Sequence, residues 1–290
     1  MSDGEIKSTW AAVQDHTRHF SDFTFVYPVI SRRSKGLSIG VNLNPDKVCN
    51  FDCIYCEVDR RIPGAVAEVD LRQMKDELTA MVRFAKDGGL AKEPKFDEVP
   101  WLTRAVKDIA FSGDGEPTMI QNFAECVETV VEVQQLEGLD ETKIVLITDA
   151  AGLDKAGVKR GLETMDAHNG EIWGKLDAGT EEYYRQVNRS NVKYQRILNN
   201  LLETARVRPI IIQSLFLKVH GEAMSDGELG AYCDRVRDLT AAGGQISEVH
   251  LYTVARPTPE AFAAKLEVPE LEAMAETVRE RTDLRVSIYP

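Results

Sequence analysis

The stretch from residue 37 to residue 60, LSIGVNLNPDKVCNFDCIYCEVDR, joins an apolar segment to a polar loop that contains three cysteines. Its first seven residues, Leu37–Leu43, form an apolar, β-rich run and predict a strand. The loop that follows holds Cys49, Cys53 and Cys56 in the spacing C-x3-C-x2-C. In parallel α/β sheets the chemistry lies in loops that follow the carboxyl ends of strands, so this stretch predicts where a site would form.

Outward from this stretch, apolar β-rich runs alternate with helical patterns almost to residue 290. Such alternation predicts right-handed βαβ units and a parallel sheet, and six repeats favour an α/β fold, a partial (βα)6 TIM-like barrel. The predicted strands are Leu37–Leu43, Lys107–Ser112, Lys143–Thr148, Ile172–Asp177, Pro209–Leu217, Glu248–Val254 and Arg285–Tyr289. The predicted helices are Leu71–Ala85, Asn122–Gln135, Glu181–Ala205, Asp226–Ala241 and Pro269–Thr282.

Local signals support the helix ends and the domain division. Ser225 and Thr180 precede two predicted helices as N-cap residues, and Gly243 with Gly244 ends the first of them. We expect residues 1–36 to be an N-terminal extension packed on the barrel, because they contain five large aromatic side chains, and residues 37–290 to be the barrel. The segment Gly88–Pro100 is the most loop-like insertion in the sequence.

Composition narrows the classes of function. The chain has 290 residues, 43% of them hydrophobic, and 35 Lys and Arg against 47 Asp and Glu give a net charge of −12. An acidic chain repels a polyanion, so nucleic acid is not the expected partner, although Arg32, Arg33, Lys35, Arg60 and Arg61 could still hold a phosphate. No run of residues is apolar and long enough for a signal peptide or a membrane span, so we expect a cytoplasmic protein with no membrane partner.

Three of the five cysteines predict a metal site. Thiols in a polar loop of a chain without a disulfide framework most often bind metal; buried core cysteines and a redox pair are the alternatives. A structural zinc site needs a fourth ligand, which His16 or His19 could supply. A [4Fe–4S] cluster held by only three thiolates instead leaves one iron open to a small molecule. Cys126 and Cys233 lie singly in helical patterns and are expected to pack in the core.

The cysteine loop after a first strand resembles the radical S-adenosylmethionine (SAM) superfamily, and Tyr55 stands where that family has an aromatic residue near adenine. The resemblance implies that the open iron binds SAM and that reductive cleavage gives a 5′-deoxyadenosyl radical, which abstracts hydrogen from a substrate. It also implies a low-potential electron donor such as flavodoxin or ferredoxin. The protein would bind and orient these groups and exclude side reactions.

The second predicted strand runs into FSGDGEPT, residues 111–118. A single Asp-Gly pair is usually only a turn, whereas two glycines beside two carboxylates allow a ligand to approach the backbone closely. At this position the segment resembles the family's GGE motif, which contacts the SAM amino group. The matching residues are Asp114, Gly115 and Glu116, with Gly113 just before them.

Other strand ends supply further candidates for cofactor binding. Thr148 is a candidate because it ends the third strand. By the resemblance, Lys175 and Asp177 lie near SAM, although these two residues, two apart on a strand, could equally form a structural ion pair. Gln213 lies in an otherwise apolar run, where it serves the cofactor or only the packing, and Tyr252 ends the sixth strand.

Together with KLDAG and LYTVARP, the cysteine-loop block resembles one branch of the superfamily: iron–sulfur oxidoreductase-like proteins related to the enzyme of archaeal tRNA wyosine synthesis. The chain departs from that enzyme because no cysteine precedes Cys49, so a second cluster is not expected.

Three functions follow from these residues. The first is a single-cluster radical SAM enzyme that acts on a small molecule or a peptide. The second directs the same chemistry at a macromolecule, by tRNA modification or activation of a partner protein. The third is a non-catalytic metal-binding or redox module. Neither the substrate nor the fate of SAM can be read from the sequence.

Overall fold

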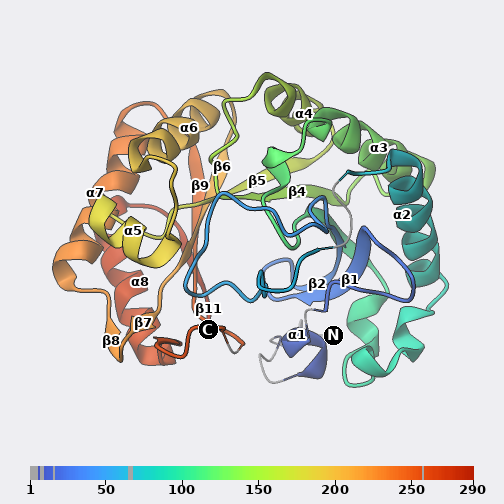
Figure 1. Cartoon of the computed structure of the whole chain (residues 1–290), viewed down its shortest axis with the longest axis horizontal. Coiled ribbons are helices and arrows are strands. Elements are labelled where there is room, and N and C mark those ends of the chain that lie inside the picture. The colour runs from blue at the N-terminus through green and yellow to red at the C-terminus, as the bar shows by residue number, and fades with distance from the viewer. Residues whose placement is uncertain (1–5, 7–9, 16, 65–67, 257) are drawn as a thin grey trace. The chain divides into compact units, whose positions relative to one another are not determined.

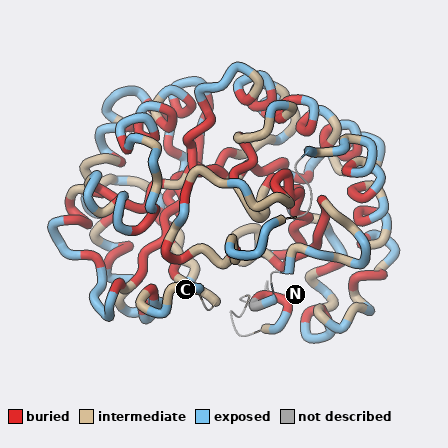
Figure 2. Tube along the Cα trace, viewed as in Figure 1, coloured by how far each residue is buried: buried red, intermediate tan, exposed pale blue. Residues whose placement is uncertain are grey.

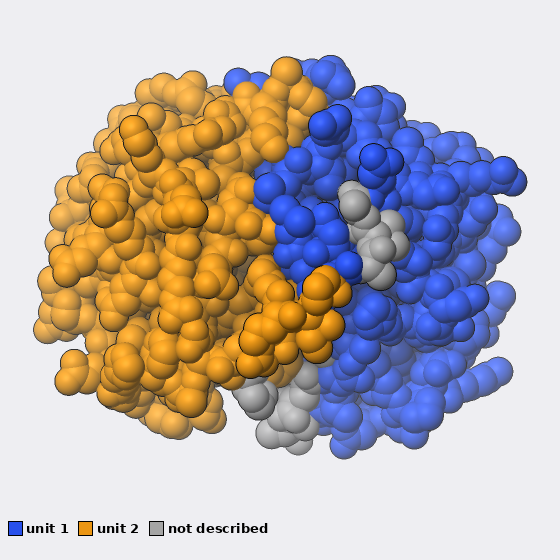
Figure 3. Space-filling view, viewed as in Figure 1, with its two compact units in different colours: residues 1–48, 64–146, 159–170 blue, residues 49–63, 147–158, 171–290 orange. Residues whose placement is uncertain are grey.

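The computed structural model describes residue 6 and residues 10–15, 17–64, 68–256 and 258–290. The chain divides into two compact units, drawn in Figure 3. Unit 1 comprises residues 1–48, 64–146 and 159–170, and unit 2 comprises residues 49–63, 147–158 and 171–290. Predicted His16 lies outside the described residues.

In unit 1 the strands form an antiparallel pair followed by parallel neighbours. Strand β1 pairs antiparallel with β2, β2 pairs parallel with β3, and β3 pairs parallel with β4. Helices α2 and α3 pack together, and Asp70 begins α2 by accepting bonds from the backbone N–H groups of Arg72 and Gln73. The elements are α1 (Ala11–Gln14), β1 (Val26–Ser31), β2 (Gly36–Val41), α2 (Leu71–Lys86), β3 (Val106–Phe111), α3 (Phe123–Leu136), β4 (Lys143–Thr148) and α4 (Ala156–Asp166), the last two continuing into unit 2.

In unit 2 parallel strands alternate with helices. Strand β6 pairs with β5 and with β9, and β9 pairs with β11. Thr180 and Ser225 cap α5 and α7 as predicted, and Gly243, at φ +91°, follows the end of α7. The elements are β5 (Gly170–Lys175), α5 (Glu181–Asn188), α6 (Tyr194–Val207), β6 (Ile210–Leu215), α7 (Asp226–Ala241), β9 (Ile246–Tyr252), α8 (Val268–Thr282), β11 (Val286–Tyr289) and the short strands β7 (Lys218–Val219), β8 (Glu222–Ala223) and β10 (Ala263–Ala264).

The strand order confirms the predicted α/β fold class. Eight strands of the described chain follow the order β1-β2-β3-β4-β5-β6-β9-β11, and helices connect the successive parallel strands. All of these strands but β3 are labelled in Figure 1. This is the topology of a partial (βα)6 TIM-like barrel. Figure 2 shows that the strands are largely buried. No helix in the described ranges is long and apolar enough to cross a membrane.

Besides the short elements α1, β7, β8 and β10, which were not predicted, three longer elements differ from the sequence prediction, each for a local reason. Strand β1 was missed because Pro28 stands inside it, which an edge strand tolerates. Helix α4 was missed because it contains Gly157 and Gly161, yet a Cβ at Gly161 would lie only 2.8 Å from the Phe123 ring, so the glycine allows close helix packing. The predicted helix Glu181–Ala205 is two helices, separated at Arg189 in the left-handed region with φ 46°.

The segment Gly88–Pro100 is packed rather than loop-like. It folds into the short 3-10 helices Leu90–Lys92 and Pro94–Phe96, and a third begins at Pro100. Leu90, Phe96 and Val99 are fully buried. Apolar burial therefore fixes this segment in spite of its glycine-rich and polar sequence.

The aromatic residues of the predicted N-terminal extension pack within unit 1. Phe25 and Tyr27 are buried, the Phe20 ring lies 5.7 Å from that of Phe84 in α2, and Trp10 packs edge-on against Trp101. Residues 26–31 of the same extension belong to the sheet itself through β1.

Candidate functional site

The cysteine loop of unit 2 is anchored by the end of helix α5. The backbone N–H groups of Asp52 and Ile54 donate to the carbonyls of Asn188 and Val187, at 3.1 and 2.9 Å. The last carbonyls of a helix have no partner inside it, so the loop provides the donors that the end of α5 lacks. This contact gives a physical reason for the break between α5 and α6, because a continuous helix would use those carbonyls itself.

All three cysteines of the loop are free thiols, and each accepts a hydrogen bond. Cys49 Sγ accepts from the backbone N–H of Phe51 at 3.5 Å, and Cys53 Sγ accepts from Asn188 Nδ2 at 3.5 Å. Cys56 Sγ accepts from the Arg60 guanidinium at 2.9 Å. Hydrogen bonds to sulfur stabilise thiolates, so the donor set suits soft metal ions.

The fit of these thiols to a metal centre depends on which centre is considered. Among the described residues, no three His, Cys, Asp or Glu side chains are grouped as a single metal ion requires. One zinc ion would bring its thiolates to within about 4 Å of one another, since each Zn–S bond is about 2.3 Å long. A [4Fe–4S] cluster binds each thiolate to a different iron and so spaces them more widely. Three thiols on one loop, with an N–H donor to each sulfur, are a soft donor set of the kind that such a cluster takes.

A polar cluster lies beside Cys53. Tyr55, Asp177 and Asn188 are buried in it, and Lys175 and Tyr252 are half-buried; we call these five residues the buried polar cluster. The Tyr55 hydroxyl donates to Asp177, and Asn188 Nδ2 donates to both Tyr55 Oη, at 3.0 Å, and Asp177 Oδ2, at 2.8 Å. Lys175 Nζ lies 3.6 Å from Asp177 Oδ1 and donates to Tyr252 Oη at 2.7 Å. The ion pair between Lys175 and Asp177 that the sequence left open is therefore present.

The protonation states in this cluster follow from burial and charge. Burial, reinforced by the charge of Asp177, raises the pKa of Tyr55 well above its ordinary value, so its hydroxyl remains a donor. Burial by itself would lower the pKa of Lys175, but Asp177 and Tyr252 outweigh it and raise that pKa, so the amine stays charged. Burial raises the pKa of the Cys53 thiol to about 12.

The face of the unit 2 sheet that bears Lys175 is unusually polar. Gly174 faces Leu201 of α6 and Ser214 faces Tyr232 of α7, so the alternate positions point away from these helices. In register across β5, β6, β9 and β11, those positions are Lys175, Gln213, His250 and Ser287. Gln213 Nε2 is buried and has no hydrogen-bond partner among the described residues, whereas barrel interiors are usually filled by Val, Ile and Leu.

The predicted site residues of unit 1 are bonded to their own neighbourhood. Asp114 accepts from Arg18 at 2.9 Å and from Asn42 Nδ2 at 2.7 Å. Glu116 accepts from both the backbone N–H and the hydroxyl of Thr118 and caps the short helix Pro117–Met119. In this arrangement the two carboxylates organise the loop.

The glycines of the same loop permit close backbone approach, as the sequence indicated. A Cβ on Gly113 would lie 2.3 Å from Asn42 Oδ1, and one on Gly115 would lie 1.9 Å from the carbonyl oxygen of Val48. The N–H of Glu116 also donates to that carbonyl, at 3.1 Å. The group that lies close to Gly115 and Glu116 is thus the backbone of Val48, the residue before Cys49.

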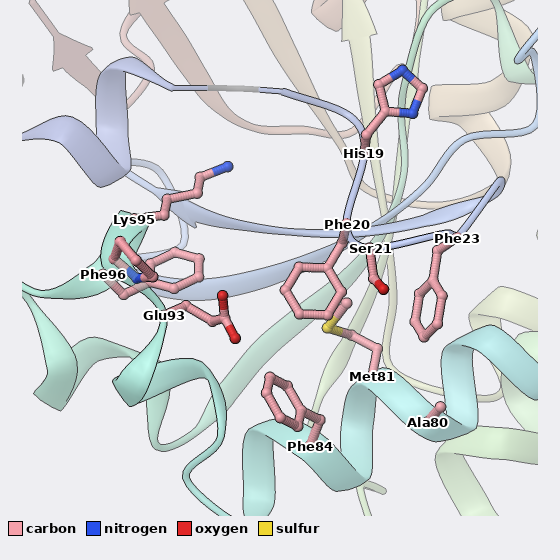
Figure 4. A pocket seen from close by; sticks show the side chains of 11 residues that line it. His19, Phe20, Ser21, Phe23, Ala80, Met81, Phe84, Glu93, Lys95 and Phe96 are labelled. Carbon is pink, nitrogen blue, oxygen red and sulfur yellow. The ribbon is translucent and has the colours of Figure 1, made fainter.

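The remaining predicted residue, Thr148, is buried in unit 2 and accepts from the N–H of Ala150 at 3.0 Å. Cys126 and Cys233 are buried in α3 and α7, as expected for core residues. His19, the described member of the predicted histidine pair, lines a pocket of about 720 Å³ in unit 1 together with Phe20, Phe84 and Phe96, shown in Figure 4. The pocket lies within unit 1 and none of the cysteines lines it.

Sequence reasoning missed Asn188, His250 and the role of Arg60. Asn188 contacts Cys53 across 135 positions of sequence, which no local pattern reveals. His250 is buried, packs edge-on against Trp173 and Tyr289, and lies 3.5 Å from Glu248 Oε2. The signal available for it was the alternation of polar residues at 248, 250 and 252 along one strand.

Comparison with solved structures identifies the fold. TYW1 with a lysine–pyruvate adduct bound matches with a TM-score of 0.54 and 18% identity, over 87% of this chain and 74% of that one. SuiB of Streptococcus suis bound to S-adenosylmethionine matches with a TM-score of 0.55 and 13% identity, over 89% and 49% of the two chains.

The chain shares its fold with these two proteins.

Sequence comparison finds relatives of low identity. No protein-family model matches the chain. A UPF0026 protein of Methanocaldococcus jannaschii is 28% identical over 176 residues, which are 61% of this chain and 46% of that protein. A UPF0026 protein of Helicobacter pylori (strain J99) is 24% identical over 80% of this chain and 66% of that protein, and the GTPase Obg of Brachyspira hyodysenteriae is 24% identical over 62% and 23%. The chain thus spans about half or less of two of these relatives.

Proposed function

We propose that this chain is a single-cluster radical SAM enzyme in which Cys49, Cys53 and Cys56 hold a [4Fe–4S] cluster. The observation that carries the proposal is the set of three free thiols on the loop after β2, each with an N–H donor, in a chain with the radical SAM fold. When bound, the cluster supplies the electron that cleaves SAM to a 5′-deoxyadenosyl radical, which takes hydrogen from the substrate.

The buried polar cluster would bind and orient SAM. Tyr55 is held by its bonds to Asp177 and Asn188, so its ring has a fixed orientation before any ligand arrives. Lys175 remains an ammonium, which suits it to attract a carboxylate rather than to attack a carbonyl as a free amine does. Within unit 1, the resemblance makes Asp114, Gly115 and Glu116 candidates for SAM contacts. These assignments follow the resemblance and the geometry of each unit by itself.

The proposed substrate is a small polar molecule or a peptide. Lys175, Gln213 and His250 give one face of the unit 2 sheet hydrogen-bonding groups that a core does not need. The net charge of −12 disfavours tRNA, the substrate class of the second hypothesis. We further propose flavodoxin or ferredoxin as electron donor and the cytoplasm as location.

Anaerobic reconstitution with iron and sulfide tests the proposal. We expect about four irons and four sulfides per chain, and 5′-deoxyadenosine after addition of dithionite and SAM. Cys53→Ala should lose both, whereas Cys126→Ala, a cysteine in the core of α3, should keep both. Zinc without sulfide, or SAM cleavage by Cys53→Ala, would overturn the proposal and favour a non-catalytic metal module or another catalyst. Retention of RNA at physiological salt would favour the tRNA alternative.

A further inference from the structure

The hydrogen-bond donor to Cys56 is charged. The Arg60 guanidinium donates to Cys56 Sγ at 2.9 Å, while Cys53 accepts from the neutral amide of Asn188 and Cys49 from a backbone N–H, each at 3.5 Å. Charge-assisted hydrogen bonds are shorter and about twice as strong as neutral ones. Cys56 Sγ therefore has a strong, charge-assisted donor in place before any metal binds.

The Arg60 side chain is half-buried. Half-buried charges are screened less than exposed ones, so its guanidinium acts on the Cys56 sulfur more strongly than a charge on the open surface would.

The neighbouring arginine has a different partner. Arg61 is exposed and donates from Nε and NH2 to the two carboxylate oxygens of Asp59, each at 2.8 Å. Two adjacent arginines thus point to different groups, one to a cysteine sulfur and one to a carboxylate. Arg61 is therefore a matched control for Arg60, because the two residues are of the same type and adjacent in the sequence but have different partners.

Reduction of a [4Fe–4S] cluster adds an electron to a group that three thiolates have already made anionic. A fixed cation at a ligand sulfur stabilises the more negative, reduced form more than the oxidised form. Hydrogen bonds to cluster sulfurs and local charge are established determinants of the reduction potential.

We propose that Arg60 is a positioning residue that raises the reduction potential of the cluster through its hydrogen bond to Cys56 Sγ. This inference rests on the proposed function, and it assigns to one side chain the ease with which the cluster accepts its electron. The donor of that electron in the test is dithionite, which is oxidised as the cluster gains one electron.

The experiment compares three variants of the full chain, Arg60→Gln, Arg60→Lys and Arg61→Gln, after anaerobic reconstitution. Iron and sulfide are counted first, and the reduced cluster is then followed by electron paramagnetic resonance in a potentiometric titration at fixed pH. We expect the equilibrium constant for one-electron reduction of the cluster to be about tenfold smaller in Arg60→Gln, a negative shift of about 59 mV in its reduction potential. Arg60→Lys should recover most of that shift, and Arg61→Gln should match the unchanged chain.

Equal potentials for Arg60→Gln and the unchanged chain, at equal iron content, would overturn the inference. If Arg60→Gln holds no iron while Arg60→Lys does, the charge is needed for assembly, and the role in potential is likewise overturned. Failure of the unchanged chain to hold a cluster or to cleave SAM refutes the proposed function itself. The two failures are therefore distinguishable.

Discussion

The buried polar cluster of unit 2 and the Asp114 loop of unit 1, residues 112–118, both carry acidic groups but hold them differently. Asp177 receives bonds from Tyr55, Asn188 and the backbone N–H of Leu215, which lie 122, 11 and 38 positions away. Asp114 is bonded by Arg18 and Asn42 at a more exposed position, and the close contacts of its loop are made by glycine backbone.

This difference predicts which kind of substitution destabilises each region. In the buried polar cluster, charge is separated from water and every polar atom needs a protein partner. In the Asp114 loop, the backbone is the critical part, because no side chain fits at Gly115. Substitutions should therefore be costly at Asp177 for electrostatic reasons and costly at Gly115 for steric reasons.

The largest effect is expected for Asp177→Ala. Its removal leaves the Lys175 ammonium nearly buried without its carboxylate, so the free energy of unfolding of the metal-free chain should fall by about 3–5 kcal/mol. Asp114→Ala, whose Arg18 partner is more exposed, should cost about 1 kcal/mol. Urea denaturation measures both, and equal losses would remove the distinction between the two regions.

Gly115→Ala comes next. The new Cβ would overlap the carbonyl oxygen of Val48 and displace the backbone beside Cys49, at an expected cost of about 1–3 kcal/mol. The matched control is Gly227→Ala in α7, where the nearest atom would be 3.9 Å away and a helical alanine should stabilise slightly. Equal denaturation midpoints for the two variants would contradict the close approach at Gly115.

Asn188→Ala should have an intermediate effect within the buried polar cluster. The change leaves Tyr55, Asp177 and Cys53 each without one donor, at an expected cost of about 1–3 kcal/mol. Asn199→Ala on exposed α6 surface serves as the control and should stay within about 0.5 kcal/mol. A thermal or urea transition unchanged by Asn188→Ala would show that this amide does not hold the cluster together.

The smallest effect is expected for Arg18→Ala. Its partly exposed bond to Asp114 should contribute about 0.5–1 kcal/mol, and high salt should reduce that contribution. Unfolding measured at low and at 1 M salt checks both statements. If Arg18→Ala lowers the free energy of unfolding by more than this, and by the same amount at both salt concentrations, Asp114 behaves as a buried charge. The contrast between the Asp114 loop and the buried polar cluster would then be weaker.

Local sequence patterns predicted the elements whose signals are short in range. The strand at β4 and the helix at α7 agree with prediction to the residue, because apolar periodicity and caps act within a few positions. Strand β1 and helix α4 were missed because Pro28 and Gly161 oppose the local preference while edge position and close packing permit them. Tertiary packing outweighed propensity at these places.

The features of the candidate site also fall into two groups, those that the local sequence predicts and those that only the tertiary structure sets. The sequence by itself determined the three thiols, their spacing and their place after a strand, because ligand type and loop position are properties of consecutive residues. Only the tertiary structure decided that Asn188 reaches Cys53, that Arg60 binds Cys56 while Arg61 binds Asp59, and that Lys175 pairs with Asp177. The bond from Asn188 to Cys53 spans 135 positions. The partners of Arg60, Arg61 and Lys175 are near in sequence, but side-chain direction and burial choose among the possible pairs, and the free energy of the whole fold sets both.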